Sequence, residues 1–76
     1  MERDFYELYE TAIKQSVPLT VSTGHNPVAD WCIEVYDRSI SRDKPVVAVQ
    51  NCDRLCVFAA AFSKLSEHLL ETRGGY

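Results

Sequence analysis

The cysteines are the first residues of this chain whose type and spacing could carry chemistry. Cys52 and Cys56 stand four residues apart where a helix is expected to begin, a place that favours thiolates. A zinc site would need two more ligands, and zinc motifs normally show two paired clusters, whereas this chain has one imperfect pair. We therefore expect no metal and no other cofactor. Free cysteines are commonly core residues, so both are expected to be buried.

A nucleophile and its base could be drawn from His25 with Asp30 or Cys32. Nucleophilic catalysis needs the base within hydrogen-bond reach of the nucleophile. A loop histidine close to proline is usually a surface residue, and a domain of this size has little volume for a substrate pocket. The chain also lacks a P-loop, a dinucleotide fingerprint and a paired-carboxylate spacing. These observations predict that the protein is not an enzyme.

Length and charge limit the classes of function that this chain can have. The 76 residues make one domain, 1–76, near the lower size limit for a single hydrophobic core. Eleven acidic against eight basic residues give a net charge of −3, which disfavours nucleic-acid binding. The odd number of cysteines, three, predicts reduced thiols, and no apolar run is long enough to cross a bilayer. We expect a cytoplasmic protein with no membrane partner.

Hydrophobic periodicity predicts five elements. Apolar residues at steps of three and four mark the two helices, and alternation marks the strands. The elements are a helix over residues 2–15, strands over residues 19–23, 30–38 and 45–50, and a helix from Leu55 to the turn at Gly74-Gly75. Asp53 or Asn51 can cap the second helix.

The connections between the strands are short, which favours an antiparallel meander, and both amphipathic helices need an apolar sheet face. The sequence therefore predicts an α+β fold of order α-β-β-β-α, with a three-stranded antiparallel sheet and two helices packed on one face. The predicted core consists of Phe5, Leu8, Ile13, Leu19, Val21, Trp31, Ile33, Val35, Val47, Val49, Leu55, Phe58, Phe62, Leu65 and Leu69.

This arrangement leaves the other face of the sheet without cover. That face would show Thr20, Ser22, Cys32, Glu34, Tyr36, Arg38, Val46, Ala48 and Gln50. It contains a mixed apolar patch, and such patches usually mark a contact surface. The expected partner is a second copy of the chain in a symmetric homodimer or a host protein, and a merely solvated sheet face is the open alternative.

The order of helix, three strands and helix resembles the double-stranded-RNA-binding domain over nearly the whole chain. That family contacts RNA through its first helix, a Gly-Pro-x-His loop between its first two strands and a lysine cluster that opens its last helix. The matching loop here is Gly24-His25-Asn26-Pro27, with these residue types in a different order. The matching helix start is Asp53-Arg54-Leu55-Cys56-Val57, which carries one base.

The resemblance implies an alternative function, a degenerate module for double-stranded RNA or DNA. In this chain the bases for such binding would be Arg38, Arg42 and Lys44, in the loop between the second and third strands. The open alternative for these three residues is a solvated hairpin loop.

Residues 30–38 and 47–53, together with the terminal Gly-Gly-Tyr, also resemble short accessory proteins of phages and mobile elements of gut bacteria. This resemblance implies a small acidic inhibitor of a host nucleic-acid-processing enzyme, similar to anti-CRISPR proteins. Carboxylates on the first helix could then compete with phosphates for a basic surface. The predicted partner-binding residues are Glu7, Glu10, Cys32, Glu34, Tyr36, Arg38, Val46 and Ala48. A further alternative is a homodimeric structural protein with no ligand.

Overall fold

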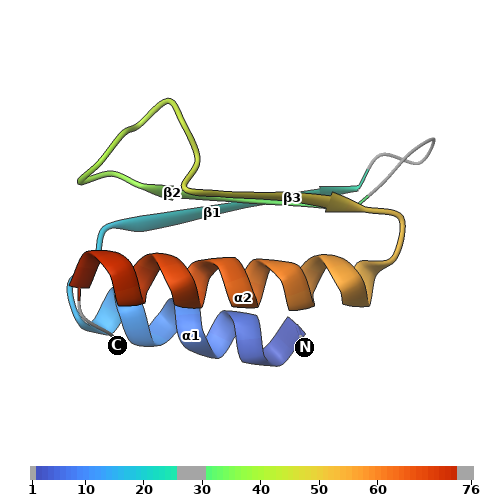
Figure 1. Cartoon of the computed structure of the whole chain (residues 1–76), viewed down its shortest axis with the longest axis horizontal. Helices are drawn as coiled ribbons and strands as arrows, with labels where there is room; N and C mark the ends of the chain where they lie inside the picture. Colours follow the sequence, from blue (N-terminus) through green and yellow to red (C-terminus); the bar gives the residue numbers. More distant parts are fainter. Residues whose placement is uncertain (1, 26–30, 74–76) are drawn as a thin grey trace.

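The computed structural model describes residues 2–25 and 31–73, which form two helices and three strands (Figure 1). In chain order they are α1 (Glu2–Lys14), β1 (Leu19–His25), β2 (Trp31–Asp37), β3 (Val47–Asn51) and α2 (Arg54–Arg73). This order and the single sheet confirm the predicted α+β fold. The first strand is two residues longer than expected, and the third begins at Val47 rather than Pro45. Asp30 and the turn expected at Gly74-Gly75 lie outside the described residues.

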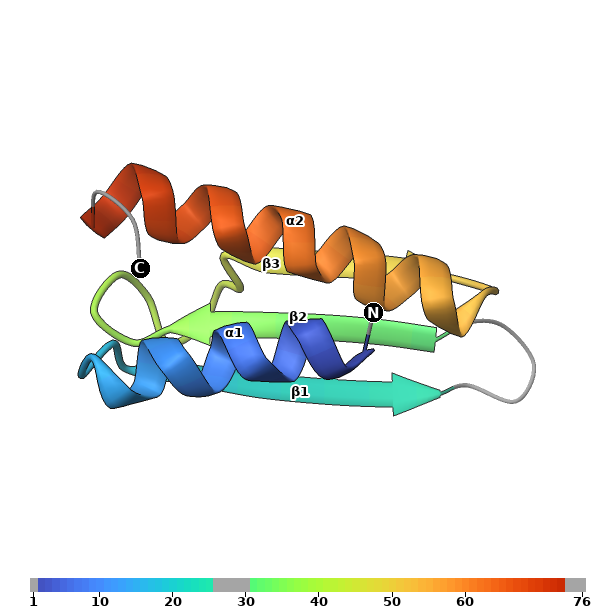
Figure 2. The ribbon, with the colours of Figure 1, turned by 90° about the horizontal axis from the view of Figure 1, so that it is seen from below.

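The sheet is antiparallel with β2 in the centre, in the order β1-β2-β3. Both helices lie on one face of the sheet (Figure 1). Residues 38–46 join β2 to β3 and form a loop that rises from the other face. Seen from the helix side, α2 runs along β3 and α1 lies beside it towards β1 (Figure 2). The face opposite the helices is called the open face below.

The core lies between the helices and the sheet, where the side chains of Phe5, Ile33, Val35, Val47 and Leu65 are almost fully buried. Two core predictions are wrong, because Ile13 and Leu55 are 40% and 64% exposed. At about 100° per residue, Leu55 lies roughly 80° from the centre of the buried stripe of α2, and Ile13 is displaced similarly on α1. Small residues that the sequence analysis omitted fill the core instead: Ala12, Val17, Val57 and Ala61.

Local backbone signals explain where the helices begin and end. Ser16 adopts a positive φ of 65°, and the amide of Val17 donates a 3.1 Å hydrogen bond to the carbonyl of Ala12. This is the pattern of a Schellman C-cap, and Pro18 then prevents the helix from continuing. Asp53 caps α2, since its Oδ1 accepts a 2.9 Å hydrogen bond from the amide of Leu55.

Within the residues that the structure describes, neither helix is both long enough and apolar enough to span a membrane.

Candidate binding surface

The open face is built around one column of side chains from the central strand. Alternate residues of a strand point to the same side, so Cys32, Glu34 and Tyr36 share this face, and all three are half-buried. The strand register places short side chains on both sides of the column: Thr20, Ser22 and Gly24 on β1, and Ala48 and Gln50 on β3. The column therefore forms a central ridge with low flanks.

Tyr36 and Glu34 interact within this column. The phenol of Tyr36 donates a 3.3 Å hydrogen bond to Oε2 of Glu34. Desolvation, followed by the negative charge of Glu34 and this hydrogen bond, raises the pKa of Tyr36 above its ordinary value. The side chain joins an aromatic ring to a polar tip, as contact tyrosines commonly do.

A buried carboxylate anchors the loop that stands over this face. Asp37 is completely buried, and its Oδ1 accepts hydrogen bonds from the amide and hydroxyl of Ser39 at 3.0 and 2.6 Å. Its Oδ2 lies 3.0 Å from Nε2 of His68 on α2. The backbone carbonyl of Asp37 accepts from the amides of Ile40 and Ser41, both at 3.0 Å. The start of the loop is thus tied through Asp37 to the helix on the other side of the sheet.

The Asp37–His68 pair was not predicted, although the sequence carries a signal for it. Trp31, Ile33 and Val35 alternate onto the covered face, and the same period places Asp37 there. His68 precedes the buried Leu69 and follows the buried Leu65 by three positions. A charged residue at a core position of a strand needs a partner, and a polar residue on the facing helix stripe can supply it.

Two of the three predicted bases lie beside one hollow of about 350 Å³ between the open face and the loop. Its lining consists of Thr20, Tyr36, Arg38, Arg42 and Asp43. Nη1 of Arg38, at the start of the loop, donates a 3.4 Å hydrogen bond to the hydroxyl of Thr20 on β1. Lys44 is exposed and does not belong to this lining, so the structure brings together Arg38 and Arg42 but not Lys44.

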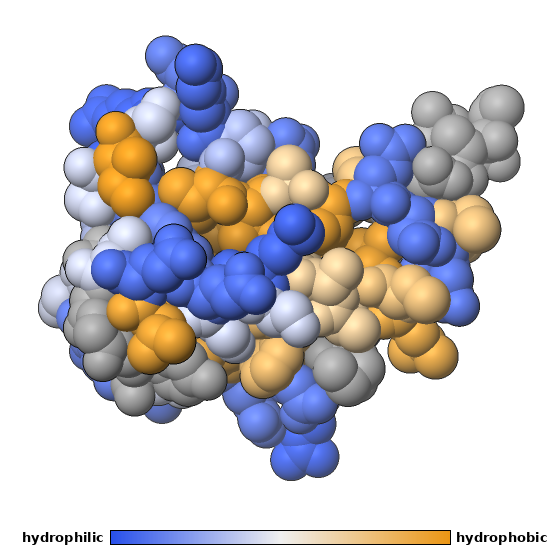
Figure 3. All heavy atoms as spheres, viewed as in Figure 1, coloured by the Kyte–Doolittle hydropathy of each residue, from blue (hydrophilic) through white to orange (hydrophobic). Residues whose placement is uncertain are grey.

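The two predicted residues on the β3 side have different environments. Val46 is half-buried and packs against the core, so its placement on the uncovered face was wrong. It precedes β3, and its amide donates a 2.8 Å hydrogen bond to the carbonyl of Val35. Ala48 is exposed and lines a shallow hollow with Cys32 and Glu34. In the space-filling view, apolar atoms show at the level of the sheet and again below it, among hydrophilic atoms (Figure 3).

The predicted acidic surface of α1 is separated from the open face by the thickness of the domain (Figure 1). Glu7 and Glu10 are both exposed, but Arg3 forms a 3.1 Å ion pair with Glu7 and offsets its charge. Glu2 is ion-paired with Arg54 at the start of α2. The structure therefore does not join the acidic residues and the sheet residues into one surface.

The cysteine predictions need correction. Cys52 and Cys56 are exposed rather than buried, because they lie at the end of β3 and in the first turn of α2, beyond the helix–sheet contact. The negative charge of Asp53 and its hydrogen bond to the thiol raise the pKa of Cys56, so this helix start does not favour a thiolate. No group of three metal-ligating side chains is found among the described residues. His25 stacks on Trp31, and Asp30 lies outside the described part; the absence of enzymatic activity stays a prediction.

We expect Cys56 to be alkylated by iodoacetamide at pH 8 more slowly than an unperturbed cysteine, because a raised pKa lowers its thiolate fraction at any given pH. Asp53→Asn should increase the rate above that of the unmodified protein, since asparagine keeps the helix cap and loses the charge. Trypsin cleaves after Arg54 and places Cys52 and Cys56 in different peptides, so mass spectrometry measures each rate. Asp43→Asn serves as the control, and an Asp53→Asn rate equal to the control's would contradict the assignment.

Comparison of the chain with protein-family models, with curated proteins and with solved structures finds no match.

Proposed function

We propose that this protein is a protein-binding module that contacts its partner through the open face of its sheet. The observation that carries this proposal is the position of the Cys32, Glu34 and Tyr36 column on the face opposite both helices. No helix or strand among the described residues covers that face. A half-buried tyrosine with low neighbours gives an accessible aromatic anchor, and tyrosine is enriched among residues that dominate binding energy.

The loop adds shape to this surface. It rises beside the floor formed by the strands, so that a partner would meet a flat floor and one wall (Figure 1). The wall carries Arg38 and Arg42, whereas Glu34 lies on the floor. Opposite charges at separate positions favour one orientation of a partner over others, which is how charge commonly contributes to interfaces.

The specific role that we propose is inhibition of a host nucleic-acid-processing enzyme by a protein of a mobile element, as for anti-CRISPR proteins. The resemblance of residues 30–38 and 47–53 and the net charge of −3 support this role. The pairing of Glu7 with Arg3 makes the acidic helix a weaker candidate for the contact than the open face. A second copy of the chain is the competing partner for the same face.

The experiment is affinity capture from the native host with the tagged protein, followed by measurement of Kd for the purified partner. We expect Tyr36→Ala to weaken binding about 30-fold or more, since interface hot spots are worth about 2 kcal/mol or more. The matched control is the double variant Glu7→Lys, Glu10→Lys, which should bind equally well. Loss of binding in the double variant with retention in Tyr36→Ala would move the contact to α1 and reject the open face.

Light scattering of the purified chain separates the two partners. A dimer that Tyr36→Ala converts to a monomer would make a second copy the partner. A monomer at high concentration would leave the host protein.

A second candidate function is nucleic-acid binding, and one observation favours it. Arg38 and Arg42 line the same hollow as the ring of Tyr36. Cations beside an aromatic ring are the combination with which proteins hold the backbone and the bases of single strands. Arg38 and Arg42 are both exposed and therefore accessible to a strand.

For this second function we expect a gel shift with RNA or DNA at low salt, where charge-driven binding is strongest. The double variant Arg38→Gln, Arg42→Gln should abolish the shift, whereas Lys44→Gln, outside the hollow, should weaken it only slightly. Undetectable affinity of the unmodified chain at low salt would remove nucleic-acid binding from consideration.

A further inference from the structure

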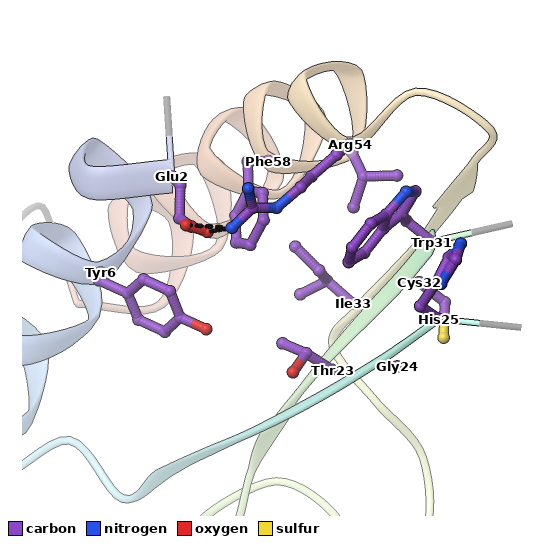
Figure 4. Close-up of a pocket in the computed structure, with 11 residues that line it drawn as sticks. Glu2, Tyr6, Thr23, Gly24, His25, Trp31, Cys32, Ile33, Arg54 and Phe58 are labelled. Atoms are coloured by element: carbon purple, nitrogen blue, oxygen red, sulfur yellow. Dashed lines mark hydrogen bonds and ion pairs between the residues drawn. The ribbon is translucent and has the colours of Figure 1, made fainter.

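A second hollow opens on the helix side of the sheet, beside the end of β1 and the start of β2 (Figure 4). Its volume is about 270 Å³, and residues of both helices and of two strands line it. Protein interiors are close-packed and contain few voids larger than a water molecule. The volume lies just below the lower end of the range of about 300–1,000 Å³ for small-molecule sites. A hollow of this size in so small a domain has room for a ligand.

The walls of this hollow are aromatic and aliphatic. Trp31 stacks on His25 with ring centroids 4.2 Å apart and an angle of 25° between the rings. The guanidinium carbon of Arg54 lies 5.4 Å from the centroid of Trp31 and 5.7 Å from that of Phe58. Figure 4 shows Trp31 between Arg54 and His25, with Ile33 beside the hollow. Contacts on both sides of the indole hold its position before any ligand arrives.

Two hydroxyl-bearing side chains border this apolar space. The phenol of Tyr6 points towards the hollow from α1, and Thr23 approaches it from β1 (Figure 4). Neither hydroxyl has a hydrogen-bond partner among the described residues. The ring of Tyr6 itself is fixed by edge contacts with Phe5 and Phe58, at centroid distances of 5.3 and 5.9 Å. Apolar walls with a few convergent polar groups are the usual composition of a small-molecule site.

The charges at this site indicate the charge of the ligand. Arg54 is paired with Glu2, and this ion pair joins the starts of the two helices beside the hollow. The pair is partly exposed and Glu2 offsets the charge of Arg54, so the two side chains together offer little net charge to an ionic ligand. A neutral ligand leaves the pair intact. Flat aromatic walls and two hydroxyls then favour a flat ring that carries hydrogen-bonding heteroatoms.

We propose that this hollow is a binding site for a neutral heteroaromatic small molecule of one or two fused rings. The ring packs against the edge of Trp31 and against Ile33 and Phe58, and its heteroatoms meet the hydroxyls of Tyr6 and Thr23. This site lies on the opposite side of the sheet from the open face, so it is independent of the protein-binding function.

The test uses indole as the probe and nuclear magnetic resonance as the readout. Trp31 is the only tryptophan of the chain, so its indole N–H gives one side-chain signal from the wall of the site. We expect a saturable shift of this signal as indole is added. Thr23→Phe should fill the hollow and weaken the affinity for indole at least ~10-fold, because the phenyl ring takes the apolar contacts that indole would otherwise make. Ser22→Phe places the same side chain on the open face and should change the affinity less than ~2-fold.

Tyr6→Phe gives a second variant that keeps the ring contacts and removes one hydroxyl. We expect it to weaken binding several-fold, and it keeps the test decisive if Thr23→Phe does not fold. Absence of a saturable shift up to the solubility of indole would overturn the proposal, as would equal affinity of the Thr23→Phe and Ser22→Phe proteins. N-acetyl-tryptophanamide mimics an aromatic side chain of a partner protein. If it binds ~10-fold tighter than indole, the site takes a partner's side chain and the small-molecule proposal is rejected.

Discussion

Replacing Leu65 by alanine should leave the protein close to unfolding at ambient temperature. Leu65 is completely buried where α2 meets the sheet. Truncation of a buried leucine costs about 2–5 kcal/mol, because it removes apolar contacts and leaves a cavity. A domain of this length has a total stability of about 4–11 kcal/mol at typical values per residue. We expect thermal denaturation to show a midpoint lowered by more than about 10 °C.

The same helix provides a matched control for this variant. Leu70 is 62% exposed, so Leu70→Ala is the identical substitution without loss of core packing. Its free energy of unfolding should change by less than about 0.5 kcal/mol. Leu55→Ala should be similarly mild, since Leu55 lies outside the core. Equal midpoints for the Leu65 and Leu70 variants would show that the wrong side of α2 has been assigned to the contact with the sheet.

Removal of the Asp37 carboxylate should be comparably damaging. Asp37→Ala leaves His68 and the groups of Ser39 without their shared acceptor inside the domain. Breaking a buried pair by removing one partner typically costs about 3–5 kcal/mol. Asp43→Ala, an exposed acid of the same loop, should change stability by less than about 0.5 kcal/mol. Denaturant unfolding measures both.

A double-mutant cycle then isolates the contact itself. Asp37→Ala and His68→Ala should show a coupling free energy of about 1–3 kcal/mol, because either change alone already removes the contact between the two side chains. Strictly additive losses would mean that His68 contributes packing only.

The sequence was sufficient for the fold because its signals are local and mutually consistent. The period of 3.6 in α1 and α2 and the alternation in β2 require the same apolar sheet face, so both helices lie on one side. Breakers at Pro18 and the cap at Asp53 set the element limits within a few residues. The open face follows from the same patterns, since two helices on one side of the sheet leave its other side without cover.

Other features depended on how the elements meet in space. The orientation of α2 about its axis decided that Leu55 is exposed and that Val57 is buried, because apolar residues on the flank of a helix stripe can point to either environment. The pairing of Asp37 with His68 joins residues 31 positions apart, and no local pattern couples them. The hollow beside Trp31 forms where the starts of both helices meet the end of β1 and the start of β2. Local periodicity determined most of the residues that face the core, whereas contacts between distant residues decided the residues at the flanks of each stripe, where charges pair and where packing leaves space.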